Sequence, residues 1–457
     1  MRKEGDAMSL IVELIKYFML VLICVYTFYC FRVFGYKSKE EQGRAYHFMS
    51  FMIIMVHFVG SATLIVQENS LKLIQLYAVE VFMFVMVLLI YRILYPKISR
   101  LLIRNMLMLL AVSFIVLTRL SYEDAIRQVM IVGASLIAGL IVPFVIFKIT
   151  ILKNLGWIFG ITGIGILLLV LVLGTTSYGA TNWITVFHVS IQPSEIVKLL
   201  FVFSIASLLR NDIGIRKLFW ISAMAGVNVI ILVLQRDLGG ALIFFVTYLF
   251  MLYAATSRPL LLVSGLIAGS GASYVAYQLF NHVRVRVMAW QNPFRYIDKE
   301  GYQIAQSLFA IGTGGWLGMG INRGLPTSIP VVESDFIFSA ISEELGGIFA
   351  ICVILIYISC FMMMINIALE LEDSFYRLLS IGYSVMFAFQ VFLSVGGVIK
   401  FIPSTGVTLP LLSQGGSSVF VTVIMFMILQ GIYIKSKKRR KNQELDDDED
   451  SEMEEME

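Results

Sequence analysis

A glutamate and a lysine stand three residues apart at the start of an apolar run, in the segment QPSEIVK from Gln192 to Lys198. Pro193 suits the first turn of a helix, and Glu195 suits the positive end of the helix dipole. At this spacing Lys198 lies on the same side of the helix as Glu195. Because a lone lysine at mid-span costs roughly 2.5–3.5 kcal/mol, we expect it to pair with an acid or to line a hydrated cavity. A structural ion pair and a functional pair both agree with the pattern.

Other polar groups stand where further apolar runs begin or end. Asp237 follows Arg236 in QRDLG, and neighbouring residues do not share a helix face, so Asp237 can point inward. Lys400 lies in GGVIKFIPSTGVTLP, where prolines and a glycine break the helix, as is tolerated beside a cavity. The stretch SQGGSS at 413–418, which contains Ser417, offers hydroxyl and N–H groups. It suits an anion cradle or a simple helix cap.

The composition places these charges in a membrane. Of the 457 residues, 58% are hydrophobic and 14% are charged, against roughly 25% charged in soluble domains. Apolar runs of about 20 residues recur along the chain, and they are too long for the strands of a membrane β-barrel. Because only helices and closed barrels can span a lipid bilayer, these runs are expected to be helices. We therefore predict an all-α polytopic membrane protein that does not bind nucleic acid. The four cysteines lie in apolar runs and the four histidines are scattered, which indicates neither a disulfide framework nor a metal site.

Hydropathy predicts about thirteen transmembrane helices. Their approximate limits are 10–33, 46–66, 72–95, 103–120, 127–147, 155–173, 194–209, 216–234, 238–256, 259–280, 336–367, 376–400 and 411–434. Lysine and arginine gather in one alternating set of connections, which predicts that this set, with the C-terminus, is cytoplasmic. An odd number of spans then leaves the N-terminus outside.

The opposite connections face outward and carry charges of both signs. They comprise 174–193, 235–239, 281–335 and 401–411. The segment 281–335 is too long for a passive connection, and apolar residues at helical spacing near Leu308 predict a short helix on the outer leaflet.

Charges gathered on one face leave two classes of function open. A transporter or flippase would use them as a pathway, and an enzyme would use them on a lipid-linked substrate. Ion-coupled transport favours inverted repeats and mid-span charges. The charges here cluster at the outer rim and no internal repeat is evident, which favours an enzyme.

Five motifs, in this order and spacing, resemble those of the RodA/FtsW/SpoVE-like SEDS family (shape, elongation, division and sporulation). They are NWITVFHVSIQPSEIVK, QRDLGGALIFF, NPFRYIDKEGYQIAQSLFAIGTGGWLGMG, SDFIFSAISEELG and IPSTGVTLPLLSQGGSS. The resemblance covers 103–434 and implies a ten-helix glycosyltransferase core. An extension of about three helices at 1–102 precedes it, as a docking surface or a segment without function. A basic, then acidic, tail at 435–457 follows, which we expect to be cytoplasmic and disordered.

The resemblance also implies an activity. SEDS proteins polymerise lipid II into peptidoglycan at the outer face of the bacterial cell membrane, in elongation, division or sporulation, with a class B penicillin-binding protein. An α-linked donor and a β-linked product imply a single inverting displacement that releases undecaprenyl diphosphate. A lipid II flippase and a non-catalytic scaffold for the transpeptidase are the alternatives.

Site residues follow from the same comparison of motifs. Aligning Asn292-Pro293 and Gly301-Tyr302 with the family puts Tyr296 where the family has its proposed catalytic aspartate. We predict that Asp298, two residues later, is the general base.

The leaving pyrophosphate needs cations. Arg286 is the first choice, because it keeps the family's spacing to the loop proline. The remaining residues expected to bind substrate, directly or by holding a cation, are Gln192, Glu195, Lys198, Asp237, Lys400 and Ser417. A divalent cation, Mg or Mn, would suit a pyrophosphate, but no motif demonstrates one.

Overall fold

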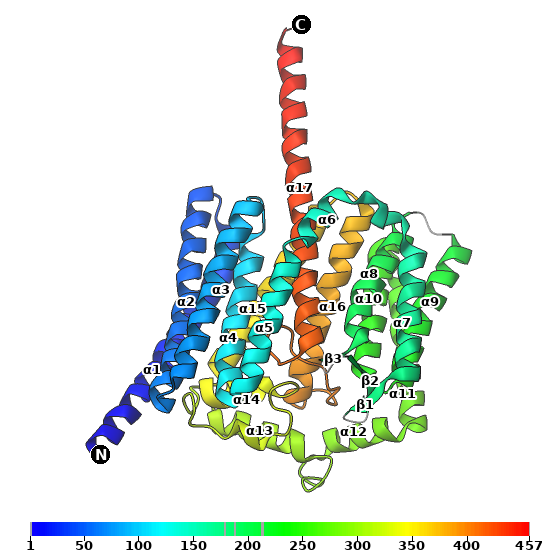
Figure 1. Cartoon of the computed structure of the whole chain (residues 1–457). Coiled ribbons are helices and arrows are strands. Elements are labelled where there is room, and N and C mark those ends of the chain that lie inside the picture. The colour runs from blue at the N-terminus through cyan, green and yellow to red at the C-terminus, as the bar shows by residue number, and fades with distance from the viewer. Residues whose placement is uncertain (1, 178–179, 187–188, 212–213, 457) are drawn as a thin grey trace.

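The computed structural model describes residues 2–177, 180–186, 189–211 and 214–456. Long helices run side by side through most of this part of the chain (Figure 1). The α-helices are α1 Arg2–Arg32, α2 Lys39–Glu68, α3 Leu71–Leu94, α4 Arg100–Leu120, α5 Tyr122–Gly139, α6 Val142–Lys148, α7 Gly156–Leu173, α8 Pro193–Leu209, α9 Ile215–Leu234, α10 Leu238–Thr256, α11 Pro259–Leu279, α12 Asn281–Gln291, α13 Tyr302–Gly314, α14 Ile337–Leu345, α15 Gly347–Leu369, α16 Ser374–Val398 and α17 Gly416–Met456. Short 3-10 helices are η1 Val33–Gly35, η2 Thr150–Asn154 and η3 Pro326–Ser328.

The prediction of an all-α polytopic membrane protein is confirmed. In the described part of the chain, 12 helical segments are long and apolar enough to cross a membrane, with α5 and α6 together forming one of them, Tyr122–Lys148. The shorter helix α8, with 17 residues, stands inside the same bundle (Figure 1).

The single span expected at 336–367 is wrong, because the helix is broken at Gly346 into α14 and α15. Gly346 has a φ of 93°, and a side-chain carbon there would lie 2.5 Å from the nitrogen of Gly318. At this break the helix carbonyls accept hydrogen bonds from backbone N–H groups of the Gly-rich segment: the N–H of Met319 donates to the carbonyl of Glu343 at 2.9 Å. Glycine supplies both the backbone angle and the close approach.

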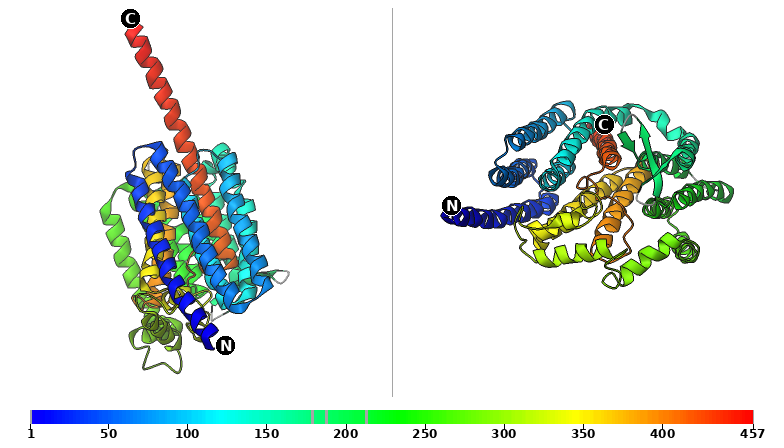
Figure 2. Two further views of the ribbon diagram at one scale, coloured as in Figure 1. Left: turned by 90° about the vertical axis from the view of Figure 1, so that its left-hand side faces the viewer. Right: turned by 60° about the horizontal axis from the view of Figure 1, so that its bottom comes forward.

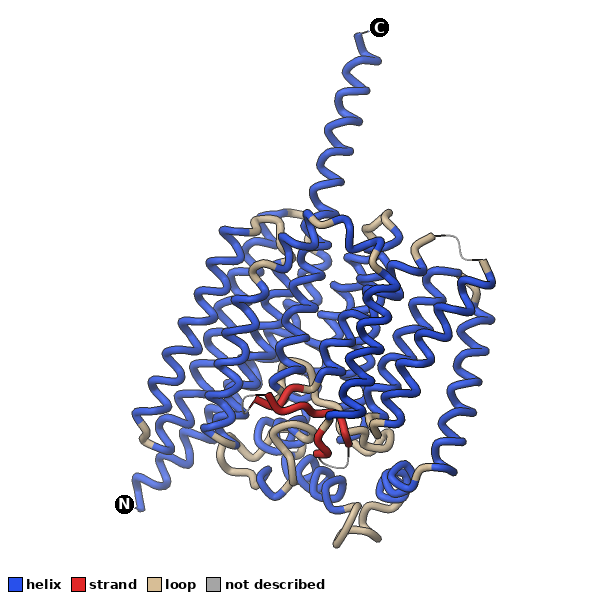
Figure 3. The backbone as a smooth tube through the Cα atoms, turned by 45° about the vertical axis from the view of Figure 1, so that its right-hand side comes forward, coloured by secondary structure: helices blue, strands red, loops and turns tan. Residues whose placement is uncertain are grey.

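The connections that were predicted to face outward hold more secondary structure than expected. The segment 174–193 contains three short antiparallel strands, β1 Thr175–Ser177, β2 Ala180–Val186 and β3 Val189–Ile191, in the order β1-β2-β3. The segment 281–335 contains the expected helix as α13, and also α12. Figure 3 shows the strands and these loops at the end of the bundle opposite the free end of α17.

The acidic tail also differs from the expectation of disorder. Helix α17 continues to Met456 over 41 residues and projects far beyond the bundle (Figures 1 and 2). Lysine, arginine, glutamine and glutamate have favourable helix propensity, which supports this continuation of the helix.

The first three helices pack against one side of the remaining bundle (Figure 2). Helix α4 lies in the interior, because 94% of its most apolar 18-residue stretch is buried. The corresponding stretch of α11 has no buried residue. A hydrogen-bond chain joins the two parts: the hydroxyl of Tyr26 in α1 donates to Asn105 Oδ1 in α4 at 2.9 Å, and Asn105 Nδ2 donates to Ser359 Oγ in α15 at 3.0 Å.

Candidate functional site

A buried ion pair stands in the first turns of α8. Lys198 Nζ lies 2.7 Å from Glu195 Oε1 and donates to Gln390 Oε1 of α16 at 3.1 Å. Lys198 is 3% exposed and Glu195 6% exposed. Because the ammonium is enclosed by protein groups, Lys198 acts on its surroundings through Gln390.

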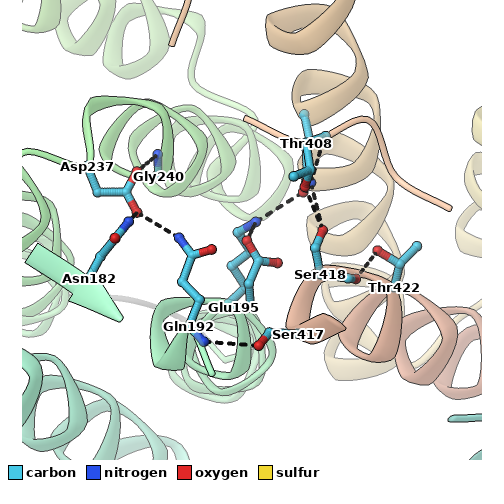
Figure 4. A network of polar contacts seen from close by, with 11 residues as sticks. Asn182, Gln192, Glu195, Asp237, Gly240, Thr408, Ser417, Ser418 and Thr422 are labelled. Atoms are coloured by element: carbon cyan, nitrogen blue, oxygen red, sulfur yellow. Dashed lines mark hydrogen bonds and ion pairs between the residues drawn. The ribbon is translucent and has the colours of Figure 1, made fainter. Parts of the chain in front are cut away.

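Gln390 connects Lys198 to the non-helical segment 402–415 that precedes α17. Its Nε2 donates to the carbonyl of Thr408 at 3.1 Å, and Thr408 Oγ1 donates to Ser418 Oγ at 2.9 Å (Figure 4). The buried ion pair therefore fixes the segment 402–415 against the start of α17.

Asp237 forms the second half of the same network. Its Oδ1 accepts from the N–H of Gly240 at 2.8 Å, which caps α10. Its Oδ2 accepts from Asn182 Nδ2 and Gln192 Nε2, each at 3.4 Å. The backbone N–H of Gln192 donates to Ser417 Oγ at 3.0 Å, so Gln192 bridges Asp237 and Ser417 (Figure 4).

These two hydrogen-bonded groups, one around Asp237 and one around Lys198, meet at the neighbouring residues Ser417 and Ser418, and we call them together the polar network. Its members are Asn182, Gln192, Glu195, Lys198, Asp237, Gln390, Thr408, Ser417 and Ser418. Five of the eight residues that the sequence singled out belong to it, and they come from three separate motifs.

Arg286, on α12, lies beside the polar network. Its Nη1 donates to the carbonyl of Ser404 at 3.1 Å. Burial lowers the pKa of Arg286, while the carboxylates of Asp335 and Asp237 raise it. Burial likewise raises the pKa of Asp335, against the opposing effects of Ser334 and Arg286.

Gly406 lies close to both charged groups. It has a φ of 69°, and a side-chain carbon there would lie 3.4 Å from Asp335 Oδ2 and 3.9 Å from Arg286 Nη2. The segment 404–406 thus passes close to an arginine and a carboxylate, and its glycine leaves room for both.

Several buried polar atoms around this site have no hydrogen-bond partner among the described residues. They are Asn182 Oδ1, Ser194 Oγ, His282 Nε2 and Thr405 Oγ1. Buried polar groups normally have partners, so such a concentration suits bound water or a polar ligand. Burial, together with Arg236 and Arg286, lowers the pKa of His282, which favours its neutral form.

Lys400 and Asp298 are not brought into the polar network. Lys400 has a φ of 61°, and its carbonyl accepts from Trp290 Nε1 at 3.1 Å; its half-buried ammonium has no hydrogen bond to any described residue. Asp298 is exposed in the turn 292–301 between α12 and α13, which extends away from the bundle (Figure 1). Its carboxylate makes no hydrogen bond or ion pair within the described part of the chain.

The sequence missed some members of the site. Gln390 is a lone amide within an apolar span, and intramembrane polar residues are a recognisable signal. The proximity of Asp335 to Arg286 was also missed, because the two residues lie 49 positions apart in the sequence. Among the described residues there is no group of three or more His, Cys, Asp or Glu side chains that could hold a metal ion.

The fold and site define a class: a multi-pass helical membrane protein with a polar network at one end of its bundle. Residues 92–438 match the family model of the cell cycle proteins FtsW, RodA and SpoVE. The chain belongs to this family, which is the SEDS family that the motifs indicated.

Curated relatives have names that state an activity. The peptidoglycan glycosyltransferase RodA of Mycobacterium tuberculosis is 35% identical over 300 residues, which cover 62% of this chain and 64% of that protein. The match thus spans less than two thirds of that relative. The probable peptidoglycan glycosyltransferase FtsW of Geobacter sp. is 31% identical over 277 residues, 58% of this chain and 75% of that protein.

Two solved structures share the fold. One belongs to a peptidoglycan synthase complex and has a TM-score of 0.63 at 24% identity, covering 74% of this chain and 98% of that chain. The other is the crystal structure of the Thermus thermophilus rod shape determining protein RodA, with a TM-score of 0.55 at 23% identity, covering 74% and 97%. Both coverages leave about a quarter of this chain unmatched, a share comparable to that of the N-terminal helices.

Proposed function

We propose that this protein is a peptidoglycan glycosyltransferase that polymerises lipid II into glycan strands. The observation that carries the proposal is the position of Arg286 beside Asp335 and the polar network, at the end of the bundle that carries the long loops. The names of the RodA and FtsW relatives support the same activity.

In this reaction a sugar hydroxyl displaces a lipid pyrophosphate, so negative charge develops on the leaving group. Arg286 and Lys400 carry cationic groups that can stabilise that charge. Lys198, enclosed by Glu195 and Gln390, positions the segment 402–415 rather than contacting substrate. The unpaired polar atoms of Asn182, Ser194 and Thr405 supply hydrogen bonds to the headgroup.

Asp298 is proposed as the general base that takes the proton of the attacking hydroxyl. Its carboxylate is exposed and makes no internal hydrogen bond to a described residue, so it is free to meet a substrate. Asp335 is instead half-buried next to Arg286, which suits it to hold the guanidinium in place.

The proposal also covers the orientation of the protein in the membrane, its two parts and its partner. The end that carries the 281–335 segment would face outward, and the end that carries the C-terminus would face the cytoplasm of a bacterial cell. The core at 103–434 would form the enzyme, and residues 1–102 an added helical unit. A class B penicillin-binding protein is the proposed partner, in keeping with the synthase complex that shares the fold.

The test is polymerisation of labelled lipid II by the purified full-length protein in detergent. Asp298→Asn should lower the rate by about 10²–10⁴-fold, the usual contribution of a general base. Lys299→Gln, in the same exposed turn, is the matched control and should retain activity.

Two outcomes would contradict the proposal at different levels. Full activity of Asp298→Asn would remove Asp298 from the mechanism and make Asp335→Asn the next variant to assay. Absence of glycan product from the unmodified protein, together with lipid II transfer across vesicles, would favour the flippase.

A further inference from the structure

A second group of charges lies at the opposite end of the bundle, where the N-terminal helices meet α4. A small, partly open pocket with a cavity volume of about 40 Å³ lies between the start of α2, the end of α3 and the start of α4. Its lining combines four basic side chains with apolar ones: His47, Arg92, Arg100 and Arg104, with Val87, Leu88, Tyr91, Pro96, Ile98 and Ile103. We call it the basic pocket.

The three arginines of the basic pocket have no acidic partner among the residues that the structure describes. The guanidinium of Arg104 donates to the carbonyls of Tyr46 and Arg100 at 2.7 and 3.0 Å, and to Ser50 Oγ at 2.9 Å. All three acceptors are neutral. Among the described residues, no carboxylate lies within ion-pair distance of any of the four basic side chains. A basic side chain at a helix end can usually extend into water. Arg104 does not, because its hydrogen bonds hold the side chain in a half-buried position.

The backbone adds a further positive potential at the same place. Helix α4 begins at Arg100, Ser99 caps it, and its first turn contains no acidic residue. The positive end of a helix dipole favours an anion and disfavours a cation. Arg100 and Arg104 therefore stand where charge alone would disfavour them, unless an anion joins them.

We propose that the basic pocket binds the phosphate of an anionic glycerophospholipid. The pocket lies at the end of the membrane-spanning helices, where headgroups are found, and basic pockets between such helices suit anionic headgroups. Leu88 is half-buried and can contact the start of an acyl chain, whereas Val87, Ile98 and Ile103 are buried behind it.

The bound lipid would join the N-terminal helices to the core. His47 and Arg92 lie on α2 and α3, two of the N-terminal helices, whereas Arg100 and Arg104 lie on α4. One phosphate between them neutralises charges on both sides and removes the repulsion between the two parts. The inference does not depend on the catalytic proposal, because no residue of the polar network is involved.

The experiment measures lipid retained by the full-length purified protein. Native mass spectrometry would compare phosphatidylglycerol with phosphatidylcholine for the unmodified chain and for Arg92→Gln/Arg100→Gln. These two side chains make no hydrogen bond within the described structure, so the variant should fold, which thermal unfolding without added lipid checks. Arg216→Gln/Lys217→Gln, at the same end but outside the pocket, is the control.

We expect the pocket variant to retain about tenfold less phosphatidylglycerol than the control, with phosphatidylcholine unchanged, since each basic residue near a membrane surface contributes several-fold. Equal loss in both variants, or no loss, would overturn the proposal. Displacement of the lipid by millimolar inorganic phosphate, with equal thermal stabilisation, would also overturn it in favour of a soluble anion.

Discussion

At the scale of single residues, the Glu195–Lys198 pair is positioned to organise a site rather than to meet its substrate. The two side chains neutralise each other at 2.7 Å, and Lys198 has Gln390 as its second partner. Gln390 in turn holds the backbone at Thr408. The charge is tolerated inside the membrane because Glu195 neutralises it and Gln390 accepts its hydrogen bond.

Removing one partner of this pair should be costly, because it leaves an uncompensated buried charge. Lys198→Met should destabilise the fold by about 3–5 kcal/mol and abolish glycan synthesis. The double variant Glu195→Gln/Lys198→Met should recover much of the stability, since no charge remains, but little activity, since Gln390 loses its cation. Thermal unfolding and the lipid II assay measure the two effects.

A control for that experiment is the pair Lys153 and Asp373 at the other end of the bundle. Lys153→Met should lower stability and leave polymerisation unchanged in the protein that remains folded. If the double variant at Glu195 and Lys198 polymerised at the normal rate, the pair would have only a structural role.

At the scale of helices, the N-terminal extension is attached to the core by polar as well as apolar contacts. Asn105 accepts from Tyr26 and donates to Ser359, which links α1, α4 and α15. At the end of the bundle that carries α13, Lys16 Nζ donates to the carbonyl of Gly318 at 3.2 Å and Gln67 Nε2 to that of Ile321 at 3.2 Å. The extension therefore also supports the Gly-rich segment after α13.

Loss of the Tyr26 hydroxyl should loosen this attachment. Hydrogen bonds between membrane helices contribute roughly 0.6–1.7 kcal/mol, so Tyr26→Phe should destabilise the protein by about 1 kcal/mol. Tyr29→Phe is the matched control on the same helix, because its hydroxyl has no hydrogen bond to a described residue. Equal unfolding temperatures for the two variants would show that the Asn105 link contributes nothing.

At the scale of the whole molecule, the two ends of the bundle differ in chemistry. One end carries the strands, α12 and α13 (Figure 3), with charges of both signs. The other carries the basic pocket and the projecting part of α17. An enzyme that builds a polymer outside the cell needs its site on the first end and its basic end in the cytoplasm.

Cysteine labelling tests this orientation. In a variant without the four native cysteines, Lys299→Cys should react with an impermeant maleimide in intact cells. Arg216→Cys, equally exposed at the other end, should react only after the membrane is opened. The reverse pattern would invert the molecule and remove access of the polar network to the outer leaflet.

Much of the architecture follows from local sequence, because lipid imposes long apolar helices that hydropathy detects. The spans were predicted closely except at Gly346, where pairing with the distant segment 315–320 breaks the helix. The short strands were missed, since they form by pairing within one connection. The helix at the acidic end was missed because charge composition alone suggests disorder.

The sequence by itself determined the class of fold, the family motifs and most of the polar side chains that gather at the site, since residue type and hydropathy are local properties. Only the tertiary structure decided which of them meet. It joined Gln192, Asp237 and Ser417 through hydrogen bonds, enclosed Lys198, and left Asp298 exposed on a turn. Such contacts depend on how separate helices pack, and no spacing along one segment encodes the distance to another.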